Sequence, residues 1–301
     1  MPRTITVGLD GSPESRAAAE WAAREAALRG LPLKIVHVWE PVPAPMAQAP
    51  LLGPETQQHW SERVPRESAE GLRLRHPGVE ITAEQIPGGA SEVLSRLPED
   101  TELLVLGSRG MSGIGGFMVG SVAMIVVAHA TQPVVLVRAG EQAADEHELD
   151  PAGIPSAAAP FRPVVLGLDT DGPDDSVIEF AFAEAARRYT SLRVVHGWNP
   201  PPYYVYGLSA DPGLRAELGR QQAETLAEVL LPWRQKFPAV IVTEESRFGQ
   251  AANHLVDASH EASLVVVGRR VRRNPFGVHI GPVTHSVLHH STAPVAVVAH
   301  G

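Results

Sequence analysis

Ile5-Thr6-Val7-Gly8-Leu9-Asp10 is the stretch that decides the fold of this chain. The run is short and apolar, which is typical of a strand buried on both faces of a parallel sheet. A helix is expected directly after it, capped by Ser12 or Ser15 and ended by Gly30. The next strand is expected at Leu33–Val38. A strand, a helix and a second strand in this order predict a β-α-β unit.

The rest of the first half continues this alternation. Further strands are predicted at 79–85, 103–106 and 134–137, and further helices at 57–75, 90–97 and 122–129. Right-handed crossovers then place helices on both faces of one parallel sheet. The predicted fold class is α/β, with a doubly wound, five-stranded parallel-sheet sandwich in this half.

The second half of the chain repeats the first. Four segments recur in the same order, 159 residues later for the first two and 161 residues later for the last two. The pairs are Ile5–Asp10 with Val164–Asp169, Lys34–Trp39 with Arg193–Trp198, Leu104–Gly107 with Val265–Gly268, and His129–Val135 with His290–Ala296. Four ordered matches at a nearly constant offset indicate a duplication. The chain is therefore predicted to hold two tandem domains of this fold.

The domain boundaries follow from the segment between the copies. Residues 140–160 are acidic, then rich in alanine and proline, with no apolar periodicity. This composition predicts a linker of semi-extended character. The expected domains are residues 1–139 and residues 161–301.

Composition excludes several classes of function. The net charge of −9 argues against a general binder of nucleic acid or of acidic membranes, which needs a basic surface. The chain has no cysteine, so disulfides, thiolate nucleophiles and cysteine-ligated metals are excluded. The longest apolar run, Val122–Ala128, is far shorter than the roughly 20 residues that span a bilayer. A cytoplasmic protein that binds neither nucleic acid nor membrane is expected.

A glycine-rich loop in the first copy is the strongest candidate for a binding site. Gly107 ends a predicted strand, five more glycines follow by position 120, and Ser121 opens a helix. Glycines allow close approach of the backbone to a phosphate, and a helix N-terminus favours an anion. The alternative is a surface loop followed by an N-capping serine, and composition alone leaves both open. The strand order of open α/β sheets places such a loop beside Asp10 and the end of the second strand.

Spacing adds a family resemblance to this physical argument. Gly107-Ser108-Arg109-Gly110, nine residues and then Gly120-Ser121 fit G-x2-G-x9-G-[S/T]. This signature resembles that of the ATP-binding universal stress proteins, whose fold is of the adenine-nucleotide alpha hydrolase-like (HUP) type. The likeness covers nearly all of both halves. No G-x-x-x-x-G-K-[ST] is present, which argues against a P-loop NTPase.

The resemblance implies where an ATP molecule, with or without Mg²⁺, is bound. Gly107, Gly110, Gly120 and Ser121 are expected around the ribose and phosphates, with Val122 close to the phosphates. Asp10 and the backbone of Val38 are expected near the adenine. The full set of candidates in the first copy is Gly8, Asp10, Val38, Leu106, Gly107, Gly110, Gly120, Ser121 and Val122.

The second copy departs from the signature. Val271 replaces the second glycine and Pro282 replaces the serine, so at least two donors are lost where phosphates are expected. Candidates for a second site remain at Gly167, Asp169, Gly197, Val267, Gly268, Gly281 and Val283. The first domain is therefore expected to bind ATP, and the second to bind it weakly or not at all. Arginines at 269, 270, 272 and 273 are either a substitute phosphate clamp or a solvated loop.

The functional interpretation is an ATP-binding module of stress response or signalling. No catalytic residue is assigned, because Asp10 and Asp169 have no paired carboxylate or histidine in the sequence. No metal ligand is assigned either, although His285 and His289 lie four residues apart. Two alternatives remain: a slow ATPase or phosphotransferase, and a nucleotide-free interaction scaffold. A dimer of tandem chains is further expected, together with a protein partner that the sequence does not identify.

Overall fold

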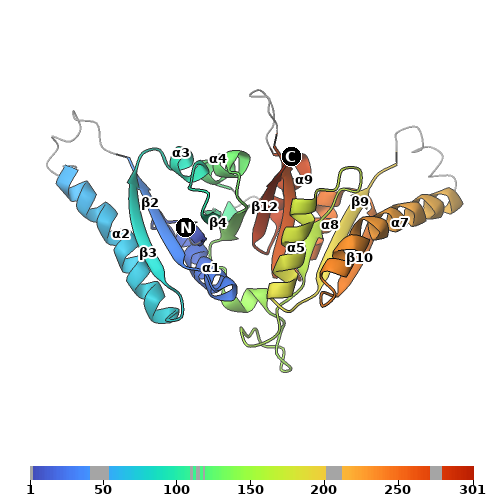
Figure 1. Cartoon of the computed structure of the whole chain (residues 1–301), viewed down its shortest axis with the longest axis horizontal. Helices are drawn as coiled ribbons and strands as arrows, with labels where there is room; N and C mark the ends of the chain where they lie inside the picture. The colour runs from blue at the N-terminus through green and yellow to red at the C-terminus, as the bar shows by residue number, and fades with distance from the viewer. Residues whose placement is uncertain are drawn as a thin grey trace. The chain divides into compact units, whose positions relative to one another are not determined.

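The computed structural model describes residues 3–40, 54–108, 111–112, 116–117, 119–200, 212–271 and 280–301. The chain divides into two compact units, Met1–Gln142 and Ala143–Gly301 (Figure 1). Each unit is an α/β fold, as the duplication predicts. Within the described ranges, no helix combines the length and apolar character that a membrane span requires.

The first unit holds a five-stranded parallel sheet. Its strands are β1 (Thr4–Gly8), β2 (Leu33–Trp39), β3 (Ile81–Pro87), β4 (Thr101–Ser108) and β7 (Val134–Arg138), in the order β3-β2-β1-β4-β7. Its helices are α1 (Pro13–Arg29), α2 (Pro54–Arg75), α3 (Ala90–Ser95) and α4 (Ser121–His129). The order reverses between β1 and β4, where ligands bind in open α/β sheets.

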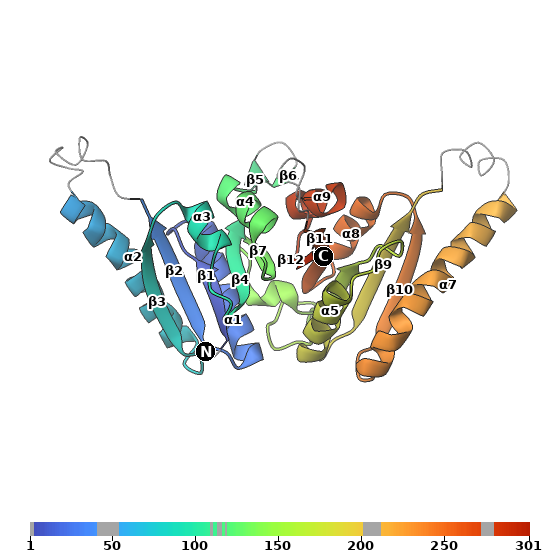
Figure 2. The ribbon, with the colours of Figure 1, turned by 45° about the horizontal axis from the view of Figure 1, so that its top comes forward.

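Helices cover both faces of this sheet (Figure 2). Helices α1 and α2 pack on one face, while α3 and α4 pack together on the other. Fully buried apolar side chains form the core, among them Ile5, Trp21, Ile35 and Leu104. The doubly wound arrangement predicted from the alternating strands and helices is confirmed.

The second unit has the same architecture. Its strands are β8 (Val164–Gly167), β9 (Leu192–Trp198), β10 (Val242–Phe248), β11 (Leu264–Arg270) and β12 (Val295–His300), in the order β10-β9-β8-β11-β12. Its helices are α5 (Asp175–Arg187), α7 (Pro212–Lys236), α8 (Ala251–Ser259) and α9 (Pro282–His290). All pairings among these five strands are parallel.

The segment predicted as a linker is folded from Ala143 onwards. It begins with the 3₁₀ helix η1 (Ala143–Glu146). The His147 ring then lies against the Phe161 ring with centroids 4.0 Å apart, and the Arg162 Nε donates to the His147 carbonyl at 2.8 Å. The Asp150 carboxylate closes the turn by accepting two backbone N–H groups. Local hydrogen bonds and one aromatic contact therefore replace the expected semi-extended chain. Such contacts leave no apolar periodicity in the sequence, so they could not be predicted from it.

The two copies end their first helix differently. Gly30 ends α1 in the left-handed conformation, with φ 63° and ψ 34°, and donates to the Ala26 and Ala27 carbonyls. The matching residue in the second copy is Tyr189, which adopts φ 51° with a side chain that is almost fully exposed. A side chain in this conformation costs about 1–2 kcal/mol, whereas glycine adopts it freely.

Tyr189→Gly is therefore expected to raise the free energy of unfolding by about 0.5–1 kcal/mol, because the strain exceeds the chain entropy that glycine adds. The matched control is Gly30→Ala. An added Cβ at Gly30 meets nothing within 4 Å, so the cost of about 1 kcal/mol comes from φ alone. Urea unfolding of both variants measures the two shifts. Two shifts of the same sign would contradict this account.

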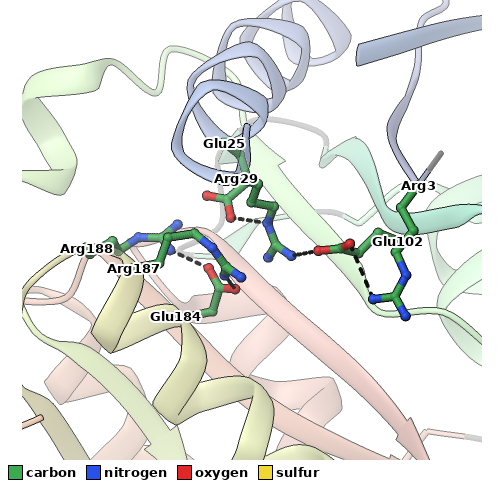
Figure 3. A network of polar contacts seen from close by, with 7 residues as sticks. All are labelled: Arg3, Glu25, Arg29, Glu102, Glu184, Arg187 and Arg188. Atoms are coloured by element: carbon green, nitrogen blue, oxygen red, sulfur yellow. Dashed lines mark hydrogen bonds and ion pairs between the residues drawn. The ribbon is translucent and has the colours of Figure 1, made fainter. Parts of the chain in front are cut away.

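Each of these helices also carries a buried Glu–Arg pair at the same place in the repeat (Figure 3). The Arg29 Nε donates to Glu25 at 2.6 Å, and the two side chains are 4% and 1% exposed. Arg29 also donates to Glu102 on β4 at 2.6 Å. At the C-terminal end of α5, Arg188 donates to Glu184, and these side chains are 0% and 1% exposed. Hydrophobic periodicity in the sequence does not reveal that these charged side chains are part of the interior.

Candidate functional site

A cavity of about 450 Å³ lies at the carboxyl edge of the first sheet, at the reversal between β1 and β4. Every described residue among the candidates of the first copy lines it: Gly8, Asp10, Val38, Leu106, Gly107, Gly120, Ser121 and Val122. Gly110 lies outside the described residues. The structure thus brings together strand ends and a helix N-terminus that are far apart in the sequence.

Asp10 places a carboxylate at the rim of this cavity. Its Oδ1 accepts the Ser12 backbone N–H at 2.9 Å, and its own N–H donates to the Ser15 hydroxyl at 3.3 Å. Burial raises the pKa of Asp10, but hydrogen bonds from Ser12 and Ser15 outweigh it and hold the pKa below its ordinary value. The carboxylate is therefore ionised at neutral pH. Ser12 itself caps α1, which settles the choice between Ser12 and Ser15.

Gly107 has a packing role in addition to lining the cavity. A Cβ at this position would lie 2.5 Å from the Glu14 carbonyl carbon and 2.7 Å from the Ser15 nitrogen. These are backbone atoms of α1, so they cannot move aside as a flexible side chain does. Glycine is needed here because β4 passes directly beneath the first turn of α1.

Gly107→Ala is consequently expected to destabilise the first unit by about 2 kcal/mol, within the range for overpacking. Gly268 is the matched position, where a Cβ would meet mainly the His300 ring at 2.9 Å. That ring can rotate, so Gly268→Ala is expected to cost less than about 1 kcal/mol. Thermal unfolding of the two variants compares these costs. Equal costs would show that contact with the α1 backbone does not decide the effect.

Helix α4 presents its N-terminus to the cavity. Its N-cap is Gly120, with φ −63° and ψ 150°, and Ser121, Val122 and Ala123 follow along the cavity wall. A glycine N-cap has no side chain to accept the first N–H groups of the helix. These donors and the helix dipole favour an anion. The preceding loop contains a short hairpin, in which β5 (Met111–Ser112) pairs with β6 (Gly116–Phe117).

Sequence reasoning missed part of the cavity wall. Ala90 and Leu94 of α3 line it, as do Ser12, Glu14 and Ser15 at the start of α1. The strand order decides which helices reach the cavity, and the sequence does not give that order. The internal repeat does point to Leu94, because a leucine also occurs 161 residues later, at Leu255 in α8.

The second unit has a cavity of about 400 Å³ in the same place. All seven candidates of the second copy line it: Gly167, Asp169, Gly197, Val267, Gly268, Gly281 and Val283. Arg269, Arg270 and His300 are also part of its wall. Arginines 272 and 273 lie outside the described residues. The duplication therefore extends to the cavity, although the side chains around it differ.

The histidines of the chain have different surroundings. The Nδ1 of His37 and of His196 lie 2.7 and 3.0 Å from the carbonyls of Leu9 and Leu168, so both rings bridge the first two strands of their unit. The rings of His285 and His289 on α9 are tilted by 35° to one another, with centroids 4.5 Å apart. Burial and the neighbouring histidines lower the pKa of His285. Among the described residues, no group of three or more possible ligands is placed to hold a metal ion.

Comparison with known proteins agrees with the fold and the repeat. The model of the universal stress protein family matches residues 1–138 and again residues 160–299. Universal stress protein Rv2623 of Mycobacterium tuberculosis is 33% identical over 301 residues, covering 97% of this chain and 95% of the relative. A universal stress protein of Mycolicibacterium smegmatis is 31% identical over 307 residues, covering 98% and 96%.

A solved structure shows the same fold over both units. The crystal structure of a universal stress protein from Archaeoglobus fulgidus aligns with a TM-score of 0.68 and 18% identity. It covers 99% of this chain and 98% of its own. The chain belongs to the universal stress protein family, as two tandem domains of that family.

Proposed function

We propose that this chain is an ATP-binding universal stress protein that acts as a nucleotide-dependent module of stress response or signalling. The observation that carries the proposal is the cavity of the first unit. There the candidates Asp10, Val38, Gly107, Gly120 and Ser121 line one space beneath the N-terminus of α4.

The proposed pose follows from the charges along the cavity. Main-chain N–H groups at the start of α4 and the Ser121 hydroxyl lie at the cavity wall, and in this pose they hold the phosphates. Asp10 is anionic and therefore faces the adenosine end, together with Val38. Gly8 and Leu106 form the floor between these ends. Mg²⁺ accompanies the triphosphate in this proposal.

Relatives with bound ligands agree with the ligand class. Universal stress proteins have been solved in complex with cAMP and in complex with dAMP. Each of these structures covers less than half of this chain, so the choice of ligand rests on the cavity and the glycine signature.

Binding without efficient turnover is favoured over the enzyme alternative. A general base works best when its pKa lies near the operating pH. Hydrogen bonds from Ser12 hold the pKa of Asp10 low, which makes its carboxylate a poor proton acceptor. We further propose a cytoplasmic location, a dimer of tandem chains, and an unidentified protein partner that senses the bound nucleotide.

The first test is to measure nucleotide content and turnover. Purified protein is denatured, released nucleotide is quantified by chromatography, and stripped protein is titrated with ATP. About one ATP per chain, with no ADP formed over hours, is the expected result. Released ADP together with turnover of added ATP would support the slow ATPase or phosphotransferase. No nucleotide and no binding on titration would support the scaffold.

A further inference from the structure

The cavity of the second unit keeps the end that the proposed pose assigns to adenosine. Asp169 and Gly197 stand where Asp10 and Val38 stand in the first unit. Leu255 of α8 lines this cavity, as Leu94 of α3 lines the first one. The carboxylate and the apolar wall are thus present in both cavities.

The other end of the second cavity has lost main-chain donors. The Val271 N–H donates to the His300 carbonyl at 2.7 Å, directly after the Arg270–His300 pair of the β11–β12 ladder. This N–H is used inside the sheet and is closed to a ligand. Pro282, the first residue of α9, has no N–H at all. Two positions of the glycine signature that are expected to bind phosphate therefore offer no main-chain N–H group in the second cavity.

Two arginine side chains also line this end of the second cavity, and Arg270 occupies the repeat position of Arg109 in the first copy. The Arg270 guanidinium lies over the loop before α5, with Nη2 2.9 Å from the place of a Cβ on Gly172. Arg270 is exposed. Arg269 also lines the cavity and is 4% exposed. Asp174, a carboxylate on the same wall, lies 3.5 Å from His300.

We propose that the second cavity binds an adenine nucleoside monophosphate in preference to ATP, with Arg270 contacting the single phosphate. This inference rests on the proposed function, because the adenosine end is assigned from the first unit. AMP carries about two negative charges, whereas a triphosphate carries about twice as many and needs more donors. One arginine and the remaining N–H groups of α9 match the smaller charge. The Asp174 carboxylate disfavours additional phosphates at the rim.

The experiment is equilibrium dialysis of the full chain with radiolabelled AMP, in the presence of unlabelled ATP that saturates the first cavity. About one AMP per chain is expected to remain bound. Arg270→Gln is expected to weaken AMP binding roughly tenfold or more, since a charge-assisted hydrogen bond is lost. The matched control is Arg16→Gln, which removes the same charge from an exposed position that lines neither cavity.

A reversed variant tests the cause of the preference. Pro282→Ser restores one N–H and one hydroxyl at the start of α9, as in Ser121. It is expected to raise ATP affinity at the second cavity roughly tenfold, so that ATP then displaces labelled AMP. An unchanged displacement by ATP would contradict the assigned role of the missing donors.

Other outcomes separate this inference from the proposed function. Two equivalents of ATP in the wild type, or equal effects of Arg270→Gln and Arg16→Gln, overturn the inference and leave ATP binding in the first unit intact. If the first cavity binds no ATP, the proposed function fails. The AMP measurement without ATP then still decides whether Arg270 contributes to a site.

Discussion

Ser121→Pro is expected to weaken ATP binding by about 100-fold or more without unfolding the first unit. The substitution removes the N–H of the first residue of α4 and the serine hydroxyl, both at the cavity wall. Each hydrogen bond to a charged phosphate contributes about 1.5–3 kcal/mol, so losing two costs at least about 3 kcal/mol of binding free energy.

The fold tolerates proline at this position for two reasons. Proline is well accommodated at the first position of a helix, and it requires an extended residue before it. Gly120 already has φ −63° and ψ 150°, nearly the values of Gly281, φ −65° and ψ 158°, before Pro282. Helix α9 thus shows that this pairing of glycine and proline occurs in the same fold.

Isothermal titration with ATP and thermal unfolding measure the two parts of this prediction. Ser121→Ala is the control, because it keeps the N–H and loses only the hydroxyl. Its affinity is expected to lie between those of the wild type and the proline variant. Full ATP affinity in Ser121→Pro would show that the phosphates do not contact the start of α4, which would contradict the proposed pose.

The framework of this protein could be predicted from its sequence because local patterns and global fold agree. The apolar run at Ile5–Asp10 gave strand β1, and its copy at Val164–Asp169 gave β8 and the tandem organisation. The ends of β1 and β8 each carry a glycine and, two residues later, an aspartate, and all four of these residues line the cavities. The duplication served as an internal check, since any local signal could be compared with its second occurrence.

The remaining features depend on tertiary contacts that no local pattern contains. Gly107 was assigned to phosphate approach, yet its closest neighbours are backbone atoms of α1. Leu94 reaches the cavity only because of the strand order. The buried glutamates and arginines of α1 and α5 look like a solvated helix face in the sequence. The roles of these residues depend on the groups that pack against them, and those neighbours are known only from the three-dimensional structure.

The buried pair of α5 supports the largest stability prediction. Glu184→Gln is expected to lower the free energy of unfolding by about 3 kcal/mol or more, because it takes one carboxylate away from the buried Arg188 guanidinium. Glu184 accepts hydrogen bonds from both Arg187 and Arg188, and its side chain is 1% exposed. Removing one partner of a buried ion pair costs more than the pair itself contributes, since the remaining charge has lost its solvent.

The double variant Glu184→Leu/Arg188→Leu separates charge burial from simple packing. Replacing both partners by apolar side chains removes the desolvated charges together, so its cost is expected to be smaller than the sum of the two single leucine variants. Urea unfolding of the single and double variants gives this coupling energy. The control Glu92→Gln breaks the exposed pair with Arg96 on α3, whose side chains are 66% and 77% exposed, and should cost well below 1 kcal/mol. If Glu184→Gln costs no more than this control, the α5 pair does not contribute to the stability of the second unit.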